Sequence, residues 1–214
     1  NAYKELENKI VYYKKVAKIV ELIVLDPIHS SIDPGAVGKN GLYEKDVTLD
    51  ISRILKKYID DSLKIKVLLT RNKDQYLSLK ARTNFANRNA ADIFISIHCN
   101  ASPKSRQARG FETYFLSEAR TNEERAVAAM ENASLMFDEE VKTAGDLNFI
   151  LYDLAQSLFL EESNNLAEAI QTSAERLLNI PARGVNQAGF YVLRGAFMPA
   201  VLVECAFISN PEEE

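Results

Sequence analysis

Short apolar segments, separated by amphipathic ones, divide most of the chain. Segments with apolar residues at consecutive positions are typical of strands that are covered on both faces of a sheet. This pattern predicts six β-strands, at 18–26, 66–71, 92–98, 110–116, 190–193 and 199–205.

Helical periodicity occupies the intervals between these strands. From 44 to 59, apolar residues such as Val47 and Ile51 recur with the period of an amphipathic helix. A second helix is predicted over 77–90, and the segment 121–178 predicts two or three more. Strands that alternate with helices favour an α/β domain, with a mostly parallel or mixed sheet of about six strands flanked by helices.

The long helical block before the fifth predicted strand interrupts this alternation. It is either a set of packing helices or an insertion that covers part of the fold. Its apolar residues form two stripes, one of Ala126, Met130, Ala133 and Phe137, the other of Leu147, Ile150, Leu151, Leu154 and Leu158.

Composition narrows the class of protein. A chain of 214 residues suits one domain. The net charge of −4 argues against a nucleic-acid partner, which usually requires a basic face. No run approaches the ~18 apolar residues of a membrane span, so none is expected. Two cysteines can form neither a disulfide scaffold nor a four-thiolate zinc site.

The two histidines both follow predicted strands. His29 lies in a loop after the first strand, and His98 ends the third strand, on the same face as Phe94 and Ser96. Ligands of open α/β sheets bind beyond the carboxyl ends of strands. Either histidine alone could be an ordinary loop residue, but both lie at such ends.

Two acids occupy positions where an unpaired charge would be costly. Glu44 shares the inward stripe of its predicted helix with Val47 and Ile51, although an acid at a helix start is also common. Glu204 shares one face of the last strand with Ala200 and Leu202. A lone acid in an apolar strand favours a functional role.

These four residues have the composition of a catalytic zinc site. Two imidazoles and one carboxylate bind zinc and leave a position for water. A further carboxylate that does not bind the metal can take a proton from that water. The spacing alone is weak evidence, because the ligands are scattered and no HExxH motif is present.

Several motifs occur in the order found in one family. The chain resembles the zinc-dependent N-acetylmuramoyl-L-alanine amidases of the AmiC-like (Amidase_3) type over about residues 19–214. The motifs are VLDPIH (24–29), DPGA (33–36), GLYEKD (41–46), LTR (69–71), SIHCNA (96–101), GFETY (110–114) and LVECAFISN (202–210).

The resemblance implies a single amidase catalytic domain over 1–214 that binds one Zn²⁺. It implies His29, Glu44 and His98 as zinc ligands and Glu204 as the catalytic carboxylate. Arg71, Asn100 and Arg183 are polar candidates for holding substrate. The family usually has glycines at the positions of Ile28, Ser30 and Ser31, where glycine permits unusual backbone angles, so this chain departs from the family around the first ligand.

The segment 119–180 resembles the inserted regulatory helices of amidases in daughter-cell separation. There a helix can lie over the zinc, with a glutamate in the position of water until a partner protein removes it. We take Glu131 as the candidate, with Glu123, Glu139 and Glu140 as alternatives, although each could equally be a solvated acid on an amphipathic helix.

The implied activity is hydrolysis of the amide between N-acetylmuramic acid and L-alanine in peptidoglycan, as in an autolysin. Such a substrate implies a periplasmic or cell-wall location, with a signal peptide that is not in this chain. Two other functions stay open: a peptidoglycan-binding or regulatory module without turnover, and a zinc peptidase that cuts within the stem peptide.

Overall fold

The computed structural model describes residues 20–103, 105–138 and 157–214. Its centre is a six-stranded sheet with the strand order β2-β1-β3-β6-β4-β5. Every neighbouring pair is parallel except β4 and β6, which are antiparallel. The mixed α/β sheet predicted from the sequence is therefore confirmed. The strands are β1 (Leu22–Pro27), β2 (Lys66–Leu69), β3 (Ile93–Asn100), β4 (Phe111–Leu116), β5 (Ala182–Ala188) and β6 (Ala200–Phe207).

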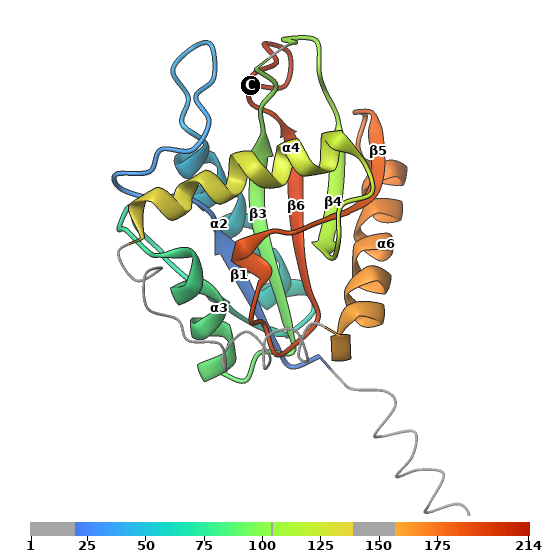
Figure 1. Ribbon diagram of the computed structural model, residues 1–214. Coiled ribbons are helices and arrows are strands. Elements are labelled where there is room, and N and C mark those ends of the chain that lie inside the picture. Colours follow the sequence, from blue (N-terminus) through green and yellow to red (C-terminus); the bar gives the residue numbers. More distant parts are fainter. Residues whose placement is uncertain (1–19, 104, 139–156) are drawn as a thin grey trace, which may run out of the picture.

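Helices cover both faces of the sheet (Figure 1). On one face, α2 (Glu44–Ser62) packs on β1, β2 and β3, and α6 (Leu160–Leu177) packs on β4, β5 and β6. The other face carries α3 (Leu79–Arg88), the 3₁₀ turn η3 (Tyr191–Leu193) and α4 (Asn122–Glu131), which continues into the 3₁₀ helix η1 (Asn132–Phe137). Figure 1 shows α4 crossing the sheet near the carboxyl ends of β3 and β6.

Alternation along β6 sorts its side chains between the two faces, as the sequence predicted. Val201 and Val203 pack with the apolar cluster under α6, whereas Ala200 and Leu202 pack with the cluster on the opposite face. Burial of such side chains is the dominant favourable contribution to folding, at about 25 cal/mol per Å² of apolar surface. Glu204 follows Leu202 by two positions and so lies on the face that α4 crosses.

The strand predicted at 190–193 is wrong. Its apolar residues are buried in the core on the α3 face, but they form the turn η3. The fifth strand is instead β5, whose sequence ARGVNQA lacks an apolar run. β5 lies at the edge of the sheet and pairs only with β4, so it buries little and has a weak hydrophobic signal.

The first predicted stripe of the helical block also differs from the structure. Ala126 is exposed and Met130 is partly exposed, whereas the buried face of α4 consists of Glu124, Ala128 and Glu131. Most of the second stripe lies outside the described residues. Within the described residues, no helix is long and apolar enough to cross a membrane.

A buried ion pair joins β1 to α3 beneath the ends of the strands. The guanidinium of Arg82 lies 2.8 Å from Asp26, and both side chains are almost completely buried. Removing one member of a buried pair leaves the other charge uncompensated, at a cost of about 3–5 kcal/mol.

We therefore expect Arg82→Met to lower the free energy of unfolding by about 3–5 kcal/mol, measured by chemical denaturation. Arg53→Met is the matched control, because Arg53 and its partner Asp50 are both exposed, so its loss should cost less than about 1 kcal/mol. Equal losses in the two variants would contradict a structural role for the buried pair.

Candidate metal centre

His29 lies in the loop after β1, and its backbone has the left-handed φ of 55°. Ser31 has a similar φ of 53°, although neither residue is a glycine. This conformation costs an L-residue about 1–2 kcal/mol, so surrounding contacts must hold it. Ser30 and Asp33 exchange two backbone hydrogen bonds, and the backbone N–H of Ser31 donates to Asp74. The departures from glycine at Ser30 and Ser31 are thus accommodated by a tightly bonded loop.

Arg71 also holds the loop that carries His29. Its guanidinium donates to the carbonyl oxygens of Pro27, Ile28 and Lys45 at 2.9, 3.0 and 2.6 Å. Because Arg71 is buried and occupied by these bonds, its assignment as a substrate-binding candidate is wrong. Its role is to position the backbone on either side of His29.

Glu44 begins α2 and is buried, as its inward phase predicted. One carboxylate oxygen accepts the backbone N–H of Ala36 at 2.8 Å, and the other accepts that of Cys99 at 3.0 Å. Gly35 permits this approach, because a Cβ there would lie 2.4 Å from the His29 ring and 2.6 Å from the Glu44 carboxylate.

His98 lies near the end of β3 and is also buried. Its Nε2 is 3.1 Å from the hydroxyl of Ser96, and that hydroxyl donates to Asp26 at 2.9 Å. Since the hydroxyl proton points to Asp26, Nε2–H of His98 must be the donor to Ser96. The lone pair of Nδ1 then faces away from the strand.

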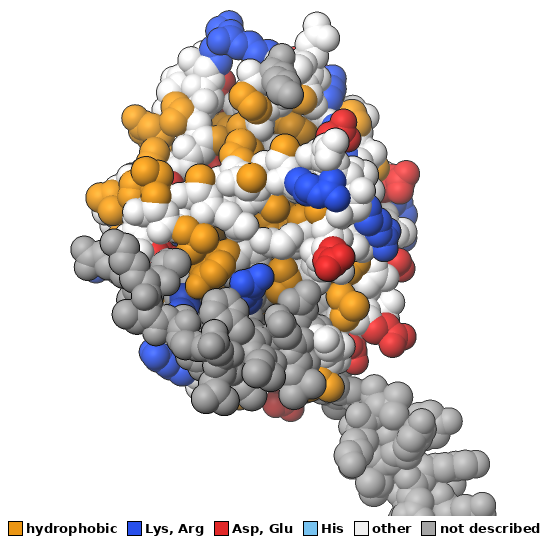
Figure 2. Space-filling view, viewed as in Figure 1, with side chains coloured by type: hydrophobic (Ala, Val, Ile, Leu, Met, Phe, Trp, Pro, Cys, Tyr) orange, Lys and Arg blue, Asp and Glu red, His pale blue; other side chains and the backbone are white. Residues whose placement is uncertain are grey.

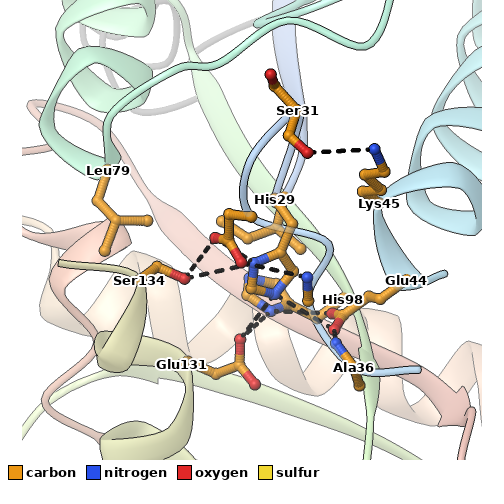
Figure 3. A network of polar contacts seen from close by, with 12 residues as sticks. His29, Ser31, Ala36, Glu44, Lys45, Leu79, His98, Glu131 and Ser134 are labelled. Atoms are coloured by element: carbon orange, nitrogen blue, oxygen red, sulfur yellow. Dashed lines mark hydrogen bonds and ion pairs between the residues drawn. The ribbon is translucent and has the colours of Figure 1, made fainter. Parts of the chain in front are cut away.

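Four side chains converge beyond the ends of these elements (Figure 3). Ligand atoms of His29, Glu44, His98 and Glu131 all lie within 4.8 Å of one another. Nε2 of His29 is 3.3 Å from the Glu44 carboxylate and 3.5 Å from that of Glu131. Nδ1 of His98 is 2.9 Å from the Glu131 carboxylate.

The atoms that meet in this cluster are all electron-pair donors. Nδ1–H of His29 donates to Asp33 at 2.8 Å, which leaves the lone pair of Nε2 directed at the cluster. Lone pairs of two imidazoles and two carboxylates repel one another in a buried space unless a cation lies among them. The donor set therefore fits a bound metal ion.

Protonation relieves the same repulsion when no ion is bound. Although burial lowers the pKa of His29, the charge of Glu44 and hydrogen bonds to neighbouring carboxylates raise it well above its ordinary value. Burial would raise the pKa of Glu131, but the two imidazoles hold it well below its ordinary value. Both directions indicate a site that attracts positive charge.

Sequence reasoning missed the residues that orient the two imidazoles. Asp33 fixes His29, and the chain from Arg82 through Asp26 to Ser96 fixes His98. Carboxylates in this position orient metal-binding histidines and increase their basicity. An acid within the buried strand β1 was a usable signal for Asp26, by the reasoning that singled out Glu204.

Glu204 lies on β6 beside this cluster, where it is paired with His98 of the neighbouring strand β3. It is fully buried, and neither carboxylate oxygen has a hydrogen-bond partner among the described residues. Burial raises its pKa well above the ordinary value, and the charges of Glu131 and Glu44 raise it further. An unpartnered buried carboxylate is suited to accept a proton from a substrate or a water.

A cover over the cluster comes from α4 and η1. Besides Glu131, the hydroxyl of Ser134 donates to Asp33 at 2.8 Å. Asn132 bonds to the backbone of Gly189 and Tyr191. Figure 2 shows neither histidine on the face that α4 crosses.

Of the three alternatives to Glu131 as the covering acid, Glu123 is the one within the described residues. Glu123 is exposed near the start of α4, whereas Glu139 and Glu140 lie outside the described residues. The remaining substrate candidates, Asn100 and Arg183, line a separate cavity along α4.

The fold and the cluster define an α/β protein with a buried candidate metal site under a covering helix. Residues 23–214 match the model of the family described as N-acetylmuramoyl-L-alanine amidase. The chain belongs to this family, Amidase_3, as its motifs predicted.

Individual relatives agree with this assignment. The chain is 38% identical to N-acetylmuramoyl-L-alanine amidase AmiC of Escherichia coli O6:H1, over 90% of this chain and 47% of that protein. It is 34% identical to AmiA of Escherichia coli K12, over 90% of this chain and 68% of that protein. The chain thus spans about half the length of the AmiC relative.

The fold has relatives among solved structures as well. The crystal structure of N-acetylmuramoyl-L-alanine amidase from Clostridium difficile 630 superposes with a TM-score of 0.68 and 28% identity. The match covers 91% of this chain and 83% of that one.

We expect metal-free protein to bind one divalent ion per chain in calorimetric titration. Asp33→Ala should weaken that binding about tenfold to hundredfold, because His29 loses the partner that orients its ring. Asp46→Ala is the control, since Asp46 is an exposed acid close to Glu44 in sequence. Unchanged affinity in the Asp33 variant would refute the positioning role.

Proposed function

We propose that this protein is a zinc-dependent amidase that hydrolyses the bond between N-acetylmuramic acid and L-alanine in peptidoglycan. The observation that carries the proposal is the convergence of His29, Glu44 and His98 beside the unpartnered Glu204. The family assignment supplies the class of substrate. The family resemblance and the buried donor set support one Zn²⁺ per chain, held by these two imidazoles and this carboxylate.

The separations within the cluster support zinc. Ligands at tetrahedral positions with bonds of ~2.0–2.1 Å lie about 3.3–3.4 Å apart. Nε2 of His29 lies 3.3 Å from one Glu44 oxygen, and Nδ1 of His98 lies 3.7 Å from the other. Because one ligand atom from each residue of the cluster lies within 4.8 Å of the others, small adjustments of the side chains would bring these two nitrogens and one carboxylate oxygen to such separations. When bound, zinc polarises a carbonyl and lowers the pKa of a water toward ~7.

Glu204 is the catalytic carboxylate in this mechanism. It accepts a proton from the attacking water, whose oxygen forms a bond to the amide carbon. As the carbon–nitrogen bond breaks, Glu204 returns the proton to the departing amine of L-alanine. The products are the muramic carboxylic acid and a peptide with a free amino terminus. Burial and the neighbouring acids raise the pKa of Glu204, which favours its acceptance of the proton from water.

We further propose that the helical block within 119–180 is a regulatory insertion in the single catalytic domain and that Glu131 is its inhibitory residue. The Glu131 carboxylate lies 2.9 Å from His98, where it would occupy the position that water needs. A protein activator would act by displacing α4. Since α6 packs on the sheet, the inhibitory part is the shorter segment of α4 and η1.

Peptidoglycan as substrate places the protein outside the cytoplasm, in the periplasm or the cell wall. In a dividing bacterium, cleavage there would serve the separation of daughter cells. The relatives AmiC and AmiA are named as amidases of the same bond.

Zinc-loaded protein is expected to release free L-alanine amino termini from purified sacculi. Glu204→Gln should lower the rate about a hundredfold to ten-thousandfold while zinc stays at one per chain, because the proton acceptor is lost. Glu175→Gln, an exposed acid on α6, is the control. Retained sacculus binding without turnover or zinc would favour a binding module, and fragments cut within the stem would identify a peptidase by mass spectrometry.

Glu131→Gln should raise the activity of the isolated protein about tenfold to hundredfold, because the cover loses a charge-assisted contact. Glu162→Gln, an exposed acid on α6, is the control and should leave the rate within about twofold. The measurement is amino-terminus release together with zinc content. Lower activity and lower zinc affinity in the Glu131 variant would instead identify Glu131 as a ligand of the working enzyme.

A further inference from the structure

Two cavities adjoin along α4, and their lining on this helix runs from Thr121 to Met130. Their volumes are about 510 and 430 Å³. Both are lined by Glu112 and Arg183 from the sheet and by Glu123 and Val127 from α4. Glu112 and Arg183 therefore lie between two parts of one groove.

The sheet register connects this groove to the candidate catalytic residues. His98 on β3 is paired with Glu204 on β6, and Glu204 is paired with Glu112 on β4. The three side chains form a row across neighbouring strands on the α4 face. Since strands lie ~4.8 Å apart, Glu112 is about 10 Å from His98. An extended peptide covers that distance in about three residues.

Arg183 is held at the end of this row. Its Nε lies 3.3 Å from the Glu112 carboxylate, and its guanidinium stacks over the ring of Phe207 at 5.0 Å. The Glu112 carboxylate also accepts hydrogen bonds from the amides of Asn100 at 2.6 Å and Asn186 at 3.1 Å. These contacts fix the plane of the guanidinium.

The outer edge of the same guanidinium remains unused. Among the described residues, the two terminal nitrogens of Arg183 make no hydrogen bond or ion pair. An arginine that served only to neutralise Glu112 would present two nitrogens to it, as bidentate pairs do. Here the contact with Glu112 is through Nε, at 3.3 Å. The paired Nη donors are left available to another planar anion.

We infer that Arg183 binds a carboxylate on the peptide arm of the substrate, so that the groove under α4 receives the stem peptide rather than the glycan. This inference rests on the proposed function. An N-acetylated glycan strand is uncharged apart from its peptides, whereas a stem peptide carries free carboxylates. An arginine side chain held in one orientation therefore distinguishes the stem peptide from the glycan. The distance along the row assigns the carboxylate to the second or third residue of the stem.

The test compares two peptides that differ only in this charge. One is L-Ala-D-Glu with its γ-carboxyl capped as a methylamide, and the other carries a carboxamide in place of the α-carboxylate. Binding is measured by NMR titration of the full chain with Glu131→Gln as a common background, so no turnover is needed. The carboxylate peptide should bind about tenfold to hundredfold more tightly, since its partner is charged.

Variants of Arg183 decide whether this residue is responsible. Arg183→Gln should bring the two peptides within about twofold of each other, and Arg183→Lys should restore part of the preference through its charge. Arg125→Gln removes an exposed guanidinium of α4 that does not line the groove and should keep the full preference. Thermal unfolding checks that all variants are folded.

Equal binding of the two peptides, or no detectable binding of either, would overturn the inference. So would a preference that survives Arg183→Gln. Cleavage of the corresponding muramoyl peptides is measured separately, as KM and kcat. If zinc is bound and no muramoyl peptide is cleaved, the result contradicts only the proposed function. If the peptides with and without the α-carboxylate are cleaved with the same KM and kcat, the result contradicts only the role of Arg183.

Discussion

The arrangement of this protein depends on one electrostatic constraint. Electron-pair donors from His29, Glu44, His98 and Glu131 meet in a buried space, where they are stable together only with positive charge among them. Each donor comes from a different element of the fold. The surrounding polar contacts act at two levels. Some orient the side chains of the cluster, and others hold the backbone that carries those side chains.

The division between these two levels explains why some charged groups near the site have their hydrogen-bonding atoms occupied and others do not. Arg71 and Arg82 both lie close to the cluster, yet their guanidinium groups are occupied by backbone carbonyls and by Asp26. They hold the loop that carries His29 and the end of β1 in place. Glu204, by contrast, has no partner among the described residues. A buried carboxylate without a partner is unfavourable for stability, and such a cost is typical of residues that act in chemistry.

Sequence could predict the parts of the fold whose signals are local. The phase of Glu44 in its helix and of Glu204 in its strand follows from the periods of 3.6 and 2, and both side chains are buried as expected. The edge strand β5 and the turn η3 were interchanged, because an edge strand has little apolar burial and a buried turn has much. The roles of Asp33 and Arg71 could not be read, since each depends on partners known only from the folded chain.

The composition of the covering helix has a consequence for how strongly it can adhere. The buried residues of α4 are Glu124, Ala128 and Glu131, so two of its three buried side chains are charged. Its apolar contacts with the core of this face come from Ala128, with Val127 and Leu135 partly buried beside it. Polar contacts lie near its ends: Glu124 caps the helix and bonds to Gln187, and Asn132 bonds to the backbone beyond β5. Displacing the helix therefore breaks a few polar contacts and exposes the part of the core that Ala128 covers.

The contact of Glu131 then couples the cover to the ion. If a cation in the cluster binds the Glu131 carboxylate more strongly than it binds water, it stabilises the covered state. By linkage, the covered state must bind the ion more tightly by the same factor. The proposed activator would therefore work against both the polar contacts and this ion-dependent one. Because the coupling would act through a single carboxylate, the candidate catalytic residues on the sheet would keep their own supports after the cover left.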